Sequence, residues 1–426
     1  MIVLHSLACS SVFIFSAALF AQKPAEKPSV NAAKTVEAYF AADAWSKPGR
    51  AERSKLLADL TTLPALEARE VDKWKATCAK LWAKGQKLEK KNGQHFLWEK
   101  PAERGLYIVG GEEQKPKGLL IAMHGGGAGS GDAWSSHGAY QAAASGLGWL
   151  MICPEVLEKT EHGWTDSGSE EFVLQLVDAA RRTWKIDANH VFFSGHSMGG
   201  YGTWTLGAHH ADRVAALAAS AGAPTPITGP SGKYEDIESG VIPSLRNVPF
   251  VVYQSDDDPN VPPAANDFAT KLLGEAKKRW GGFEYEYWQV PGRQHNEAPG
   301  GMEALLAKIA KRVRDPRPTK IVWQPALAWK QQFYWLYWSS PVKEALIEAD
   351  LDRAKNEIRV NCDRDAKGLE VLLDARLVDM SKDVVISLNG KEVFRGKPVW
   401  SLATVVKTSE TGDEELCYGA SVVLSP

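Results

Sequence analysis

The segment VFFSGHSMGGYGTW, residues 191–204, places one serine between glycines that lie two positions away on either side. Gly195, Ser197 and Gly199 form the pattern G-x-S-x-G directly after an apolar run of β type. In a sharp strand-to-helix turn this pattern holds the serine at the tip, and glycine is favoured beside it because larger side chains would collide with neighbouring backbone. Such a serine can act as a nucleophile, although the pattern alone also fits an ordinary glycine-rich turn.

A nucleophilic serine needs a histidine base, and three histidines follow Ser197 in the chain: His209, His210 and His295. The first two fall near the end of the helix expected to begin at Ser197, about 15 Å along its axis and too far to reach the hydroxyl. His295 lies in VPGRQHNEAPGG, a glycine-containing loop directly after the strand-like run FEYEYWQV. Elimination and position therefore predict His295 as the base.

The acid that orients the base is expected after the preceding strand. PFVVYQSDDDPNVPP supplies Asp256, Asp257 and Asp258 there. A run of three aspartates is typical of a solvated turn, and one of them is enough to hold an imidazole. Asp258 is preferred because Pro259 follows it and fixes the turn, with Asp256 as the main alternative.

Two backbone N–H groups near the serine would bind the oxyanion of an acyl-transfer reaction. One is expected from Met198, at the start of the helix that follows Ser197. The other is expected from the glycine run in LLIAMHGGGAGSGDAW, with Gly126 preferred and Gly127 possible, while His124 braces that loop. No lysine follows these glycines in the pattern of a phosphate-binding loop.

Three aromatic residues fall on or near these loops: Trp134, Trp164 and Tyr201. Their rings could contact a sugar or an aromatic acid, so we expect them to bind substrate. The tryptophan-rich run WQPALAWKQQFYWLYW, residues 323–338, could bind polysaccharide, but it is interpreted as the strand that joins the last domain to the domain before it.

The elements expected along the chain place these residues together. Residues 94–315 alternate apolar β-type runs with helical periodicity, which predicts an α/β domain with a mostly parallel sheet and helices on both faces. In such a sheet the sites form at the carboxyl ends of the strands. Residues 22–93 are expected to be a linker and a helical segment, and residues 316–426 a small all-β sandwich-like domain in which Asn389-Gly390 predicts a hairpin turn.

Composition and the N-terminus limit the possible functions. The 50 basic and 52 acidic residues give a net charge of −2, which does not favour nucleic-acid binding. Residues 1–21 resemble a signal peptide cleaved after Ala21, and no later run is long enough to span a membrane, so we expect a secreted or periplasmic protein. The five cysteines include no C-x-x-C pair and no H-E-x-x-H occurs, so zinc-ribbon, thioredoxin-like and H-E-x-x-H zinc sites have no support. Cys362 and Cys417 are a hypothetical disulfide of the last domain.

The runs GHSMGG, HGGG, DPNVP and GRQHN resemble those of α/β-hydrolases, over about residues 100–315. The likeness is to secreted bacterial esterases related to polyhydroxybutyrate depolymerases, feruloyl esterases and prolyl-oligopeptidase-like hydrolases. It implies the α/β-hydrolase fold and hydrolysis of carboxylic esters through an acyl-enzyme, without a metal or organic cofactor and with Ser197, His295 and Asp258 as the triad. Many relatives have glycine where Ser255 stands, which leaves the choice of acid open. The last domain is similar to accessory β-domains of exported bacterial hydrolases.

Residues 223–247 are rich in Pro, Gly and Ser and lack the amphipathic pattern of a helical cap, so we expect an open site and short acyl groups on small-molecule or polymeric esters. The glycine loop, the His295 loop and the β-domain are the expected walls of that site. A serine peptidase would use the same triad, and a polymer-binding protein with an inactive hydrolase domain is a further alternative. The natural ester and the oligomeric state stay open.

Overall fold

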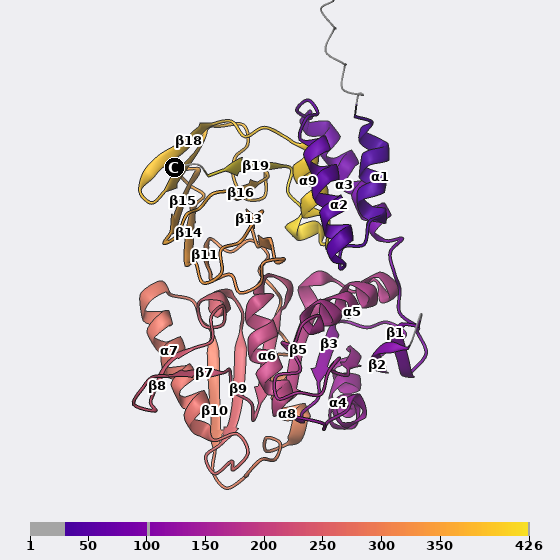
Figure 1. Cartoon of the computed structure of the whole chain (residues 1–426), viewed down its shortest axis with the longest axis vertical. Helices are drawn as coiled ribbons and strands as arrows, with labels where there is room; N and C mark the ends of the chain where they lie inside the picture. Colours follow the sequence, from indigo (N-terminus) through magenta and orange to yellow (C-terminus); the bar gives the residue numbers. More distant parts are fainter. Residues whose placement is uncertain (1–29, 100–102, 425–426) are drawn as a thin grey trace, which may run out of the picture.

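The computed structural model describes residues 30–99 and 103–424 (Figure 1). The predicted signal peptide, residues 1–21, lies outside this part of the chain. Within the described residues, no helix combines the length and the apolar character needed to cross a membrane.

The lower half of the molecule in Figure 1 is built on an eight-stranded sheet with the strand order β1-β2-β4-β3-β5-β6-β9-β10. All neighbouring pairs from β4 to β10 are parallel, and β2 is antiparallel to both of its neighbours, β1 and β4. The strands are Gly93–Trp98 (β1), Arg104–Gly111 (β2), Leu119–Met123 (β3), Leu150–Pro154 (β4), Val191–His196 (β5), Ala216–Ser220 (β6), Phe250–Ser255 (β9) and Tyr285–Val290 (β10). Strands β3, β4, β6 and β9 are buried along their whole length, which explains their continuous apolar runs.

Helices cover both faces of this sheet, as the alternation of strands and helices predicts. On one face lie α4 and α8, which pack on residues such as Leu120 and Met151. On the other lie α5, α6 and α7, which pack on the alternate residues, among them Ile121 and Ile152. The helices are Ala133–Leu147 (α4), Ser169–Trp184 (α5), Met198–His209 (α6), Pro263–Trp280 (α7) and Gly301–Ala307 (α8). The domain therefore has the α/β class.

The C-terminal region forms two further sheets, with the orders β11-β14-β15-β17-β18 and β12-β13-β16-β19. Their strands are Lys320–Trp323 (β11), Gln332–Phe333 (β12), Leu336–Trp338 (β13), Ile347–Asp352 (β14), Glu357–Cys362 (β15), Leu369–Leu373 (β16), Val384–Leu388 (β17), Lys391–Gly396 (β18) and Ala420–Val423 (β19). Asn389 and Gly390 have φ angles of 49° and 79° and join β17 to β18, as a two-residue hairpin turn requires. The expectation of an all-β domain is corrected by helix α9, Leu402–Thr408, which Ser401 caps.

The three N-terminal helices pack beside α9 in the upper half of Figure 1. They are Ala32–Ala41 (α1), Lys47–Leu60 (α2) and Ala68–Trp82 (α3). Val36 and Val71 share a core with Val405 of α9, so the first and last segments of the described chain fold together. This contact explains why α9 is a helix: its apolar face is buried against other helices.

The C-terminal region attaches to the amino edge of the large sheet. Arg314, at the end of the α/β domain, binds the side-chain oxygen of Asn189 and the backbone oxygen of Asp212, which lie shortly before β5 and β6, and it pairs with Asp413 of the C-terminal region. Ahead of β9, Asn247 donates to the backbone oxygen of Lys320 at 3.0 Å. The site expected at the carboxyl edge therefore lies at the opposite end of the strands, and the expectation that the β-domain walls it is wrong.

The tryptophan-rich run is part of this junction. Trp335 and Trp338 have no exposed surface, so they offer no face to a polysaccharide. Tyr334 donates its hydroxyl to the Ala211 backbone oxygen at 2.9 Å, and Lys330 pairs with Asp212. This run thus joins the C-terminal region to the α/β domain, as interpreted from the sequence.

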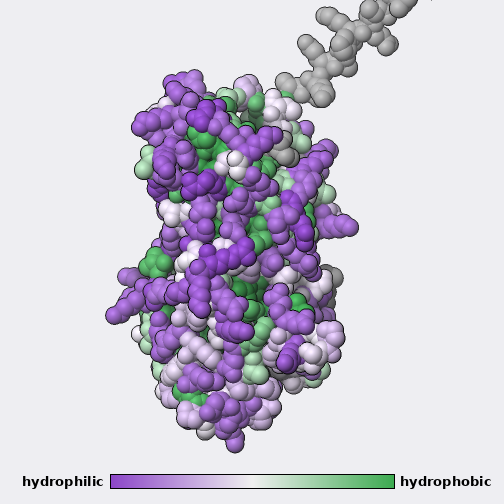
Figure 2. Space-filling model, turned by 90° about the vertical axis from the view of Figure 1, so that its left-hand side faces the viewer, coloured by the Kyte–Doolittle hydropathy of each residue, from purple (hydrophilic) through white to green (hydrophobic). Residues whose placement is uncertain are grey.

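The surface view is mainly hydrophilic, with small separate hydrophobic patches (Figure 2). Large apolar residues that are exposed are scattered along the described chain, among them Ile227, Val313 and Val399. Single exposed apolar residues are ordinary on globular proteins and need no partner to explain them.

Candidate active site

Ser197 lies at the tip of the turn between β5 and α6, with φ 59° and ψ −122°. This left-handed backbone conformation is strained for a residue with a side chain and is typical of functional positions. A Cβ atom at Gly195 would lie 2.3 Å from the backbone oxygen of Gly199, and one at Gly199 would lie 2.1 Å from that of Met123. Both contacts are with backbone that cannot move aside, so the two glycines of the motif are required by packing.

His295 reaches Ser197 from the loop after β10. Its Nε2 atom lies 2.9 Å from Ser197 Oγ, and its Nδ1 atom lies 2.8 Å from Asp258 Oδ2. The imidazole is 19% exposed, whereas the Asp258 side chain has no exposed surface. The structure thus brings the predicted nucleophile, base and preferred acid into one hydrogen-bond chain.

The three aspartates after β9 have different partners. Asp258 Oδ1 accepts the backbone N–H groups of Asn260 and Val261, both at 2.9 Å, which leaves Oδ2 directed at His295. Asp256 accepts the Gly292 N–H at 3.3 Å. Asp258 is accordingly the carboxylate of this run that contacts the imidazole.

Asp257 and Ser255 hold the base loop instead. The Ser255 hydroxyl donates to Asp257 Oδ1 at 2.6 Å and accepts the Arg293 N–H at 2.9 Å. Asp257 also accepts the Gln294 N–H at 2.8 Å, and these hydrogen bonds lower its pKa, the one from Ser255 most. The Ser255 hydroxyl therefore adds a bond between the acid loop and the loop that carries His295.

Two backbone donors expected to bind an oxyanion are free. Within the described residues, neither the Met198 N–H nor the Gly126 N–H has a hydrogen-bond partner. Met198 is the first residue of α6, where the N–H groups point out of the helix end. The glycine loop passes close to the nucleophile, because a Cβ atom at Gly125 would lie 3.1 Å from Ser197 Cβ.

His124 and Trp164 hold the glycine loop, residues 124–127, through hydrogen bonds to its backbone. His124 Nδ1 lies 2.7 Å from the Gly125 backbone oxygen, and its Nε2 accepts the Val156 N–H at 3.2 Å. Burial lowers the pKa of His124, which favours the neutral ring that this donor–acceptor pattern needs. The Trp164 indole donates to the His124 backbone oxygen at 3.2 Å. His124 therefore braces the loop, as expected.

The aromatic residues predicted to bind substrate occupy different environments. Trp164 has no exposed surface, so the prediction that it contacts substrate is wrong: its indole N–H is used inside the protein. Tyr201 is 8% exposed, and its hydroxyl lies 2.8 Å from that of Thr165. Trp134 is 49% exposed at the start of α4, and its indole donates to the Gln94 side-chain oxygen at 3.2 Å.

His196, inside the motif itself, is a residue that sequence reasoning missed. Its ring centroid lies 4.9 Å from that of His295, and its Nδ1 lies 2.9 Å from Ser220 Oγ. Burial, followed by the neighbouring His295, lowers the pKa of His196 to about 4. The signal was present in the sequence, because a histidine next to the nucleophile must lie near the loops that converge on it.

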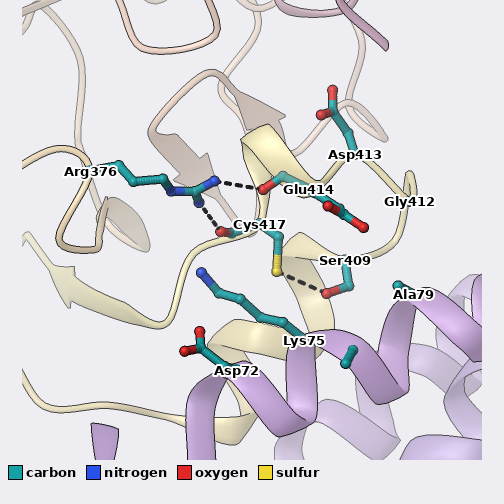
Figure 3. A pocket seen from close by; sticks show the side chains of 10 residues that line it. Asp72, Lys75, Ala79, Arg376, Ser409, Gly412, Asp413, Glu414 and Cys417 are labelled. Atoms are coloured by element: carbon teal, nitrogen blue, oxygen red, sulfur yellow. Dashed lines mark hydrogen bonds between the residues drawn. The ribbon is translucent and has the colours of Figure 1, made fainter. Parts of the chain in front are cut away.

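A separate cavity of about 370 Å³ lies between α3 and residues 409–417 (Figure 3). Three of its charged residues are paired: Lys75 with Asp374 at 3.4 Å, Asp413 with Arg314 at 2.6 Å, and Arg376 with Asp374. Because the α3 side of the molecule lies at the amino edge of the sheet, this cavity is remote from Ser197. In the part of the chain that the structure covers, no group of three or more His, Cys, Asp or Glu side chains is arranged to hold a metal ion.

The hypothetical Cys362–Cys417 disulfide is absent. Both thiols are free and buried, as are those of Cys78 and Cys153. Cys362 ends β15, whereas Cys417 packs in the helical core with Cys78, where its sulfur lies 3.1 Å from Ser409 Oγ. The two cysteines of the C-terminal region thus belong to different packing environments.

No protein-family model matches the sequence, and no curated protein matches it. The structure is similar to a thermostable esterase at 16% identity, over 53% of this chain and 63% of that one, with a TM-score of 0.40. It is similar to a ferulic acid esterase of Anaeromyces mucronatus at 18% identity, over 52% of this chain and 89% of that one, with a TM-score of 0.38. A candidate dipeptidyl aminopeptidase IV of Bacteroides ovatus shares 13% identity over 51% of this chain and 34% of that one, with a TM-score of 0.38. Likenesses this low leave the function to be argued from the site itself.

Proposed function

We propose that this protein is a serine hydrolase that cleaves carboxylic esters through an acyl-enzyme. The observation that carries the proposal is the hydrogen-bond chain from Ser197 Oγ through the His295 imidazole to Asp258, with links of 2.9 and 2.8 Å. It starts at a serine in a strained turn that is half-buried and thus partly open to solvent. A nucleophile, a base and an orienting acid in this order are the parts that acyl transfer needs.

Each residue has a defined part in the proposed reaction. Ser197 Oγ attacks the ester carbonyl carbon while His295 Nε2 takes the hydroxyl proton, and the same nitrogen then gives that proton to the leaving alcohol. Asp258 accepts the Nδ1–H, which fixes the tautomer and stabilises the imidazolium. The free N–H groups of Met198 and Gly126 are proposed to bind the oxyanion. Water then attacks the acyl-enzyme by the same steps and releases the acid.

The proposed substrates are esters with short acyl groups. Between β6 and β9, where a helical cap could stand, the chain forms a hairpin of β7, Pro226–Thr228, and β8, Tyr234–Ile237. The C-terminal region lies at the other edge of the sheet and cannot roof the site. With no helical roof to enclose a long chain, small acyl groups on larger or polymeric alcohols fit best. Export to the periplasm or beyond is likewise proposed, from residues 1–21.

Hydrolysis of p-nitrophenyl acetate tests the proposal. We expect the wild-type protein to release p-nitrophenol and Ser197→Ala to lower kcat by about 10⁴-fold or more. The Ser197→Ala variant cannot tell an esterase from a peptidase, because both activities would depend on Ser197. Peptide p-nitroanilides assayed in parallel separate the two. Cleavage of the anilides alone would replace the proposed ester substrate with a peptide, and an active Ser197→Ala variant would refute the proposed nucleophile.

A further inference from the structure

Gln254 is a fully buried polar side chain where β9 runs into the acid loop, residues 255–261. Its Nε2 atom donates to the Ser255 backbone oxygen at 3.0 Å and to the Val261 backbone oxygen at 3.1 Å, which lie at the two ends of that loop. The same nitrogen lies 3.3 Å from Asp258 Oδ2. One side-chain amide therefore bonds both ends of the loop and the carboxylate between them.

The direction of the Gln254 amide is fixed by Asn266, a fully buried residue of α7. Asn266 Nδ2 donates to Gln254 Oε1 at 2.7 Å and to the Gly222 backbone oxygen at 3.2 Å. Gln254 Oε1 thus meets a donor, while Nε2 meets three acceptors. A reversed amide would place an oxygen against those three acceptors, so only one orientation satisfies the hydrogen bonds.

The Asp258 carboxylate has no exposed surface and depends on N–H donors from the protein. Its Oδ1 accepts the backbone N–H groups of Asn260 and Val261, and its Oδ2 accepts from His295 Nδ1 and from Gln254 Nε2. The first two donors belong to the acid loop itself, and the third is the proposed base. Gln254 is the donor that lies on a strand of the sheet, so it ties the carboxylate to the rigid part of the domain.

We propose that Gln254 is a positioning residue that holds Asp258 Oδ2 against His295 Nδ1 by tying the acid loop to β9. This inference rests on the proposed function, because the contact matters through the imidazole tautomer that Asp258 selects. Among the described residues, the hydrogen bonds of the Gln254 side chain lead to Asn266, to Asp258 and to the ends of the acid loop, and none reaches Ser197. Gln254 therefore acts through Asp258.

Gln254→Met tests this role, because methionine has a similar length and no N–H donor. We expect kcat per folded molecule on p-nitrophenyl acetate to fall about 10- to 100-fold with KM little changed, since small misplacements of reacting groups cost this much. Gln332→Met is the matched control: Gln332 Nε2 also donates to two backbone oxygens, of Tyr334 at 3.1 Å and Leu416 at 2.9 Å, at the other end of the strands. This control should lose stability in urea and keep the wild-type kcat.

A double-mutant cycle separates positioning from general damage. In an Asp258→Ala background, Gln254→Met should lower kcat by less than about threefold further, because no carboxylate is left to position. General damage would instead lower kcat by the same factor in both backgrounds. That result, or a Gln254→Met variant with the wild-type kcat, would overturn the positioning role.

NMR of the side-chain amides tests the contact without a substitution at Gln254. The Gln254 amide resonances should move between the wild type and Asp258→Ala, because the carboxylate acceptor is lost, whereas those of Gln332 should stay in place. Unmoved Gln254 resonances would overturn the proposal even if Gln254→Met does not fold. A wild-type protein without Ser197-dependent activity would overturn the proposed function and leave the amide result unaffected, so the two failures are distinct.

Discussion

Ser197 Oγ and His295 Nε2 lie 2.9 Å apart although 98 positions separate the two residues in the chain. The contact arises because β5 and β10 are parallel and both end at the carboxyl edge of the sheet, with β6 and β9 between them. The His295 loop must therefore cross two strands to reach the serine, and it is bonded on the way to the acid loop after β9. The predictions about the triad therefore depend on how this loop places His295 beside Ser197.

Asp258 should be the essential carboxylate of its run. Asp258→Asn removes the acceptor for His295 Nδ1–H and is expected to lower kcat by about 10⁴-fold, because the wrong imidazole tautomer is favoured. Asp256→Asn is the matched control and should have a small effect, since Asp256 accepts one 3.3 Å bond from Gly292. Steady-state kinetics on a p-nitrophenyl ester decide the matter, and a severe Asp256 variant beside a mild Asp258 variant would contradict the assignment.

Gly199→Ala should destabilise the fold as well as the site. The added Cβ would lie 2.1 Å from the Met123 backbone oxygen, a clash that only backbone movement can relieve. Gly138→Ala is the control in helix α4, where a Cβ meets nothing within 4 Å and should stabilise the protein by about 0.5–1 kcal/mol. Urea denaturation checks both variants. Equal stability of Gly199→Ala and the wild type would show that the elbow is less tightly packed than the structure indicates.

Stability should fall in mild acid partly through His196. An unperturbed imidazole in the unfolded chain takes up a proton below about pH 6.5, whereas folded His196 stays neutral down to about pH 4. Between these values the unfolded chain binds more protons, so this contribution to stability is lost as the pH drops through the window. His196→Gln cannot titrate and should lose less stability from pH 6.5 to 4.5 in urea melts. Identical pH slopes for the two proteins would contradict the lowered pKa.

Arg314→Ala should weaken the junction at the amino edge without changing the chemistry. The arginine is almost fully buried and pairs with Asp413 at 2.6 Å, so its loss leaves a buried carboxylate unpaired and should cost about 3–5 kcal/mol. Arg395→Ala removes an exposed pair with Glu392 and should have no measurable effect. Thermal melts give the stability, and active-site titration gives kcat per folded molecule. A large fall in kcat for folded Arg314→Ala would show that the junction reaches the site.

Acyl-chain preference tests the proposed absence of a roof. Initial rates on p-nitrophenyl esters should be highest for acyl groups of about C2 to C6 and should not jump in an emulsion, because a short β7–β8 hairpin stands where a helical cap could lie. An optimum at C12 or longer, or sharp interfacial activation, would mean that the hairpin encloses the acyl chain.

Residues whose position follows from local pattern and strand order could be predicted from the sequence. The alternation of strands and helices predicted the α/β class, and motif order brought Ser197, Asp258 and His295 to one edge. Features that depend on distant packing could not be predicted. Helix α9, residues 402–408, contains four β-branched residues and is helical because the N-terminal helices cover it. Trp164 lies on a loop near the site but is buried because its indole N–H binds the His124 carbonyl.

The predicted Cys362–Cys417 disulfide and the position of His196 also depend on distant packing. Cys362 and Cys417 belong to the same predicted domain. However, Cys417 packs against the N-terminal helix α3, which was predicted to be a separate segment. The contacts of His196 could not be predicted, because the motif identifies the serine and the glycines but does not show which loop the intervening side chain contacts. Tertiary contacts between segments far apart in the chain decide both.

Covalent labelling tests the central claim most directly. Treatment with a fluorophosphonate followed by peptide mapping should place the label on Ser197, and His295→Gln should slow labelling by orders of magnitude because the hydroxyl proton has no acceptor. The account predicts label on Ser197 alone and loss of esterase activity in step with labelling. Label on another residue, or full activity after Ser197 is modified, would contradict it.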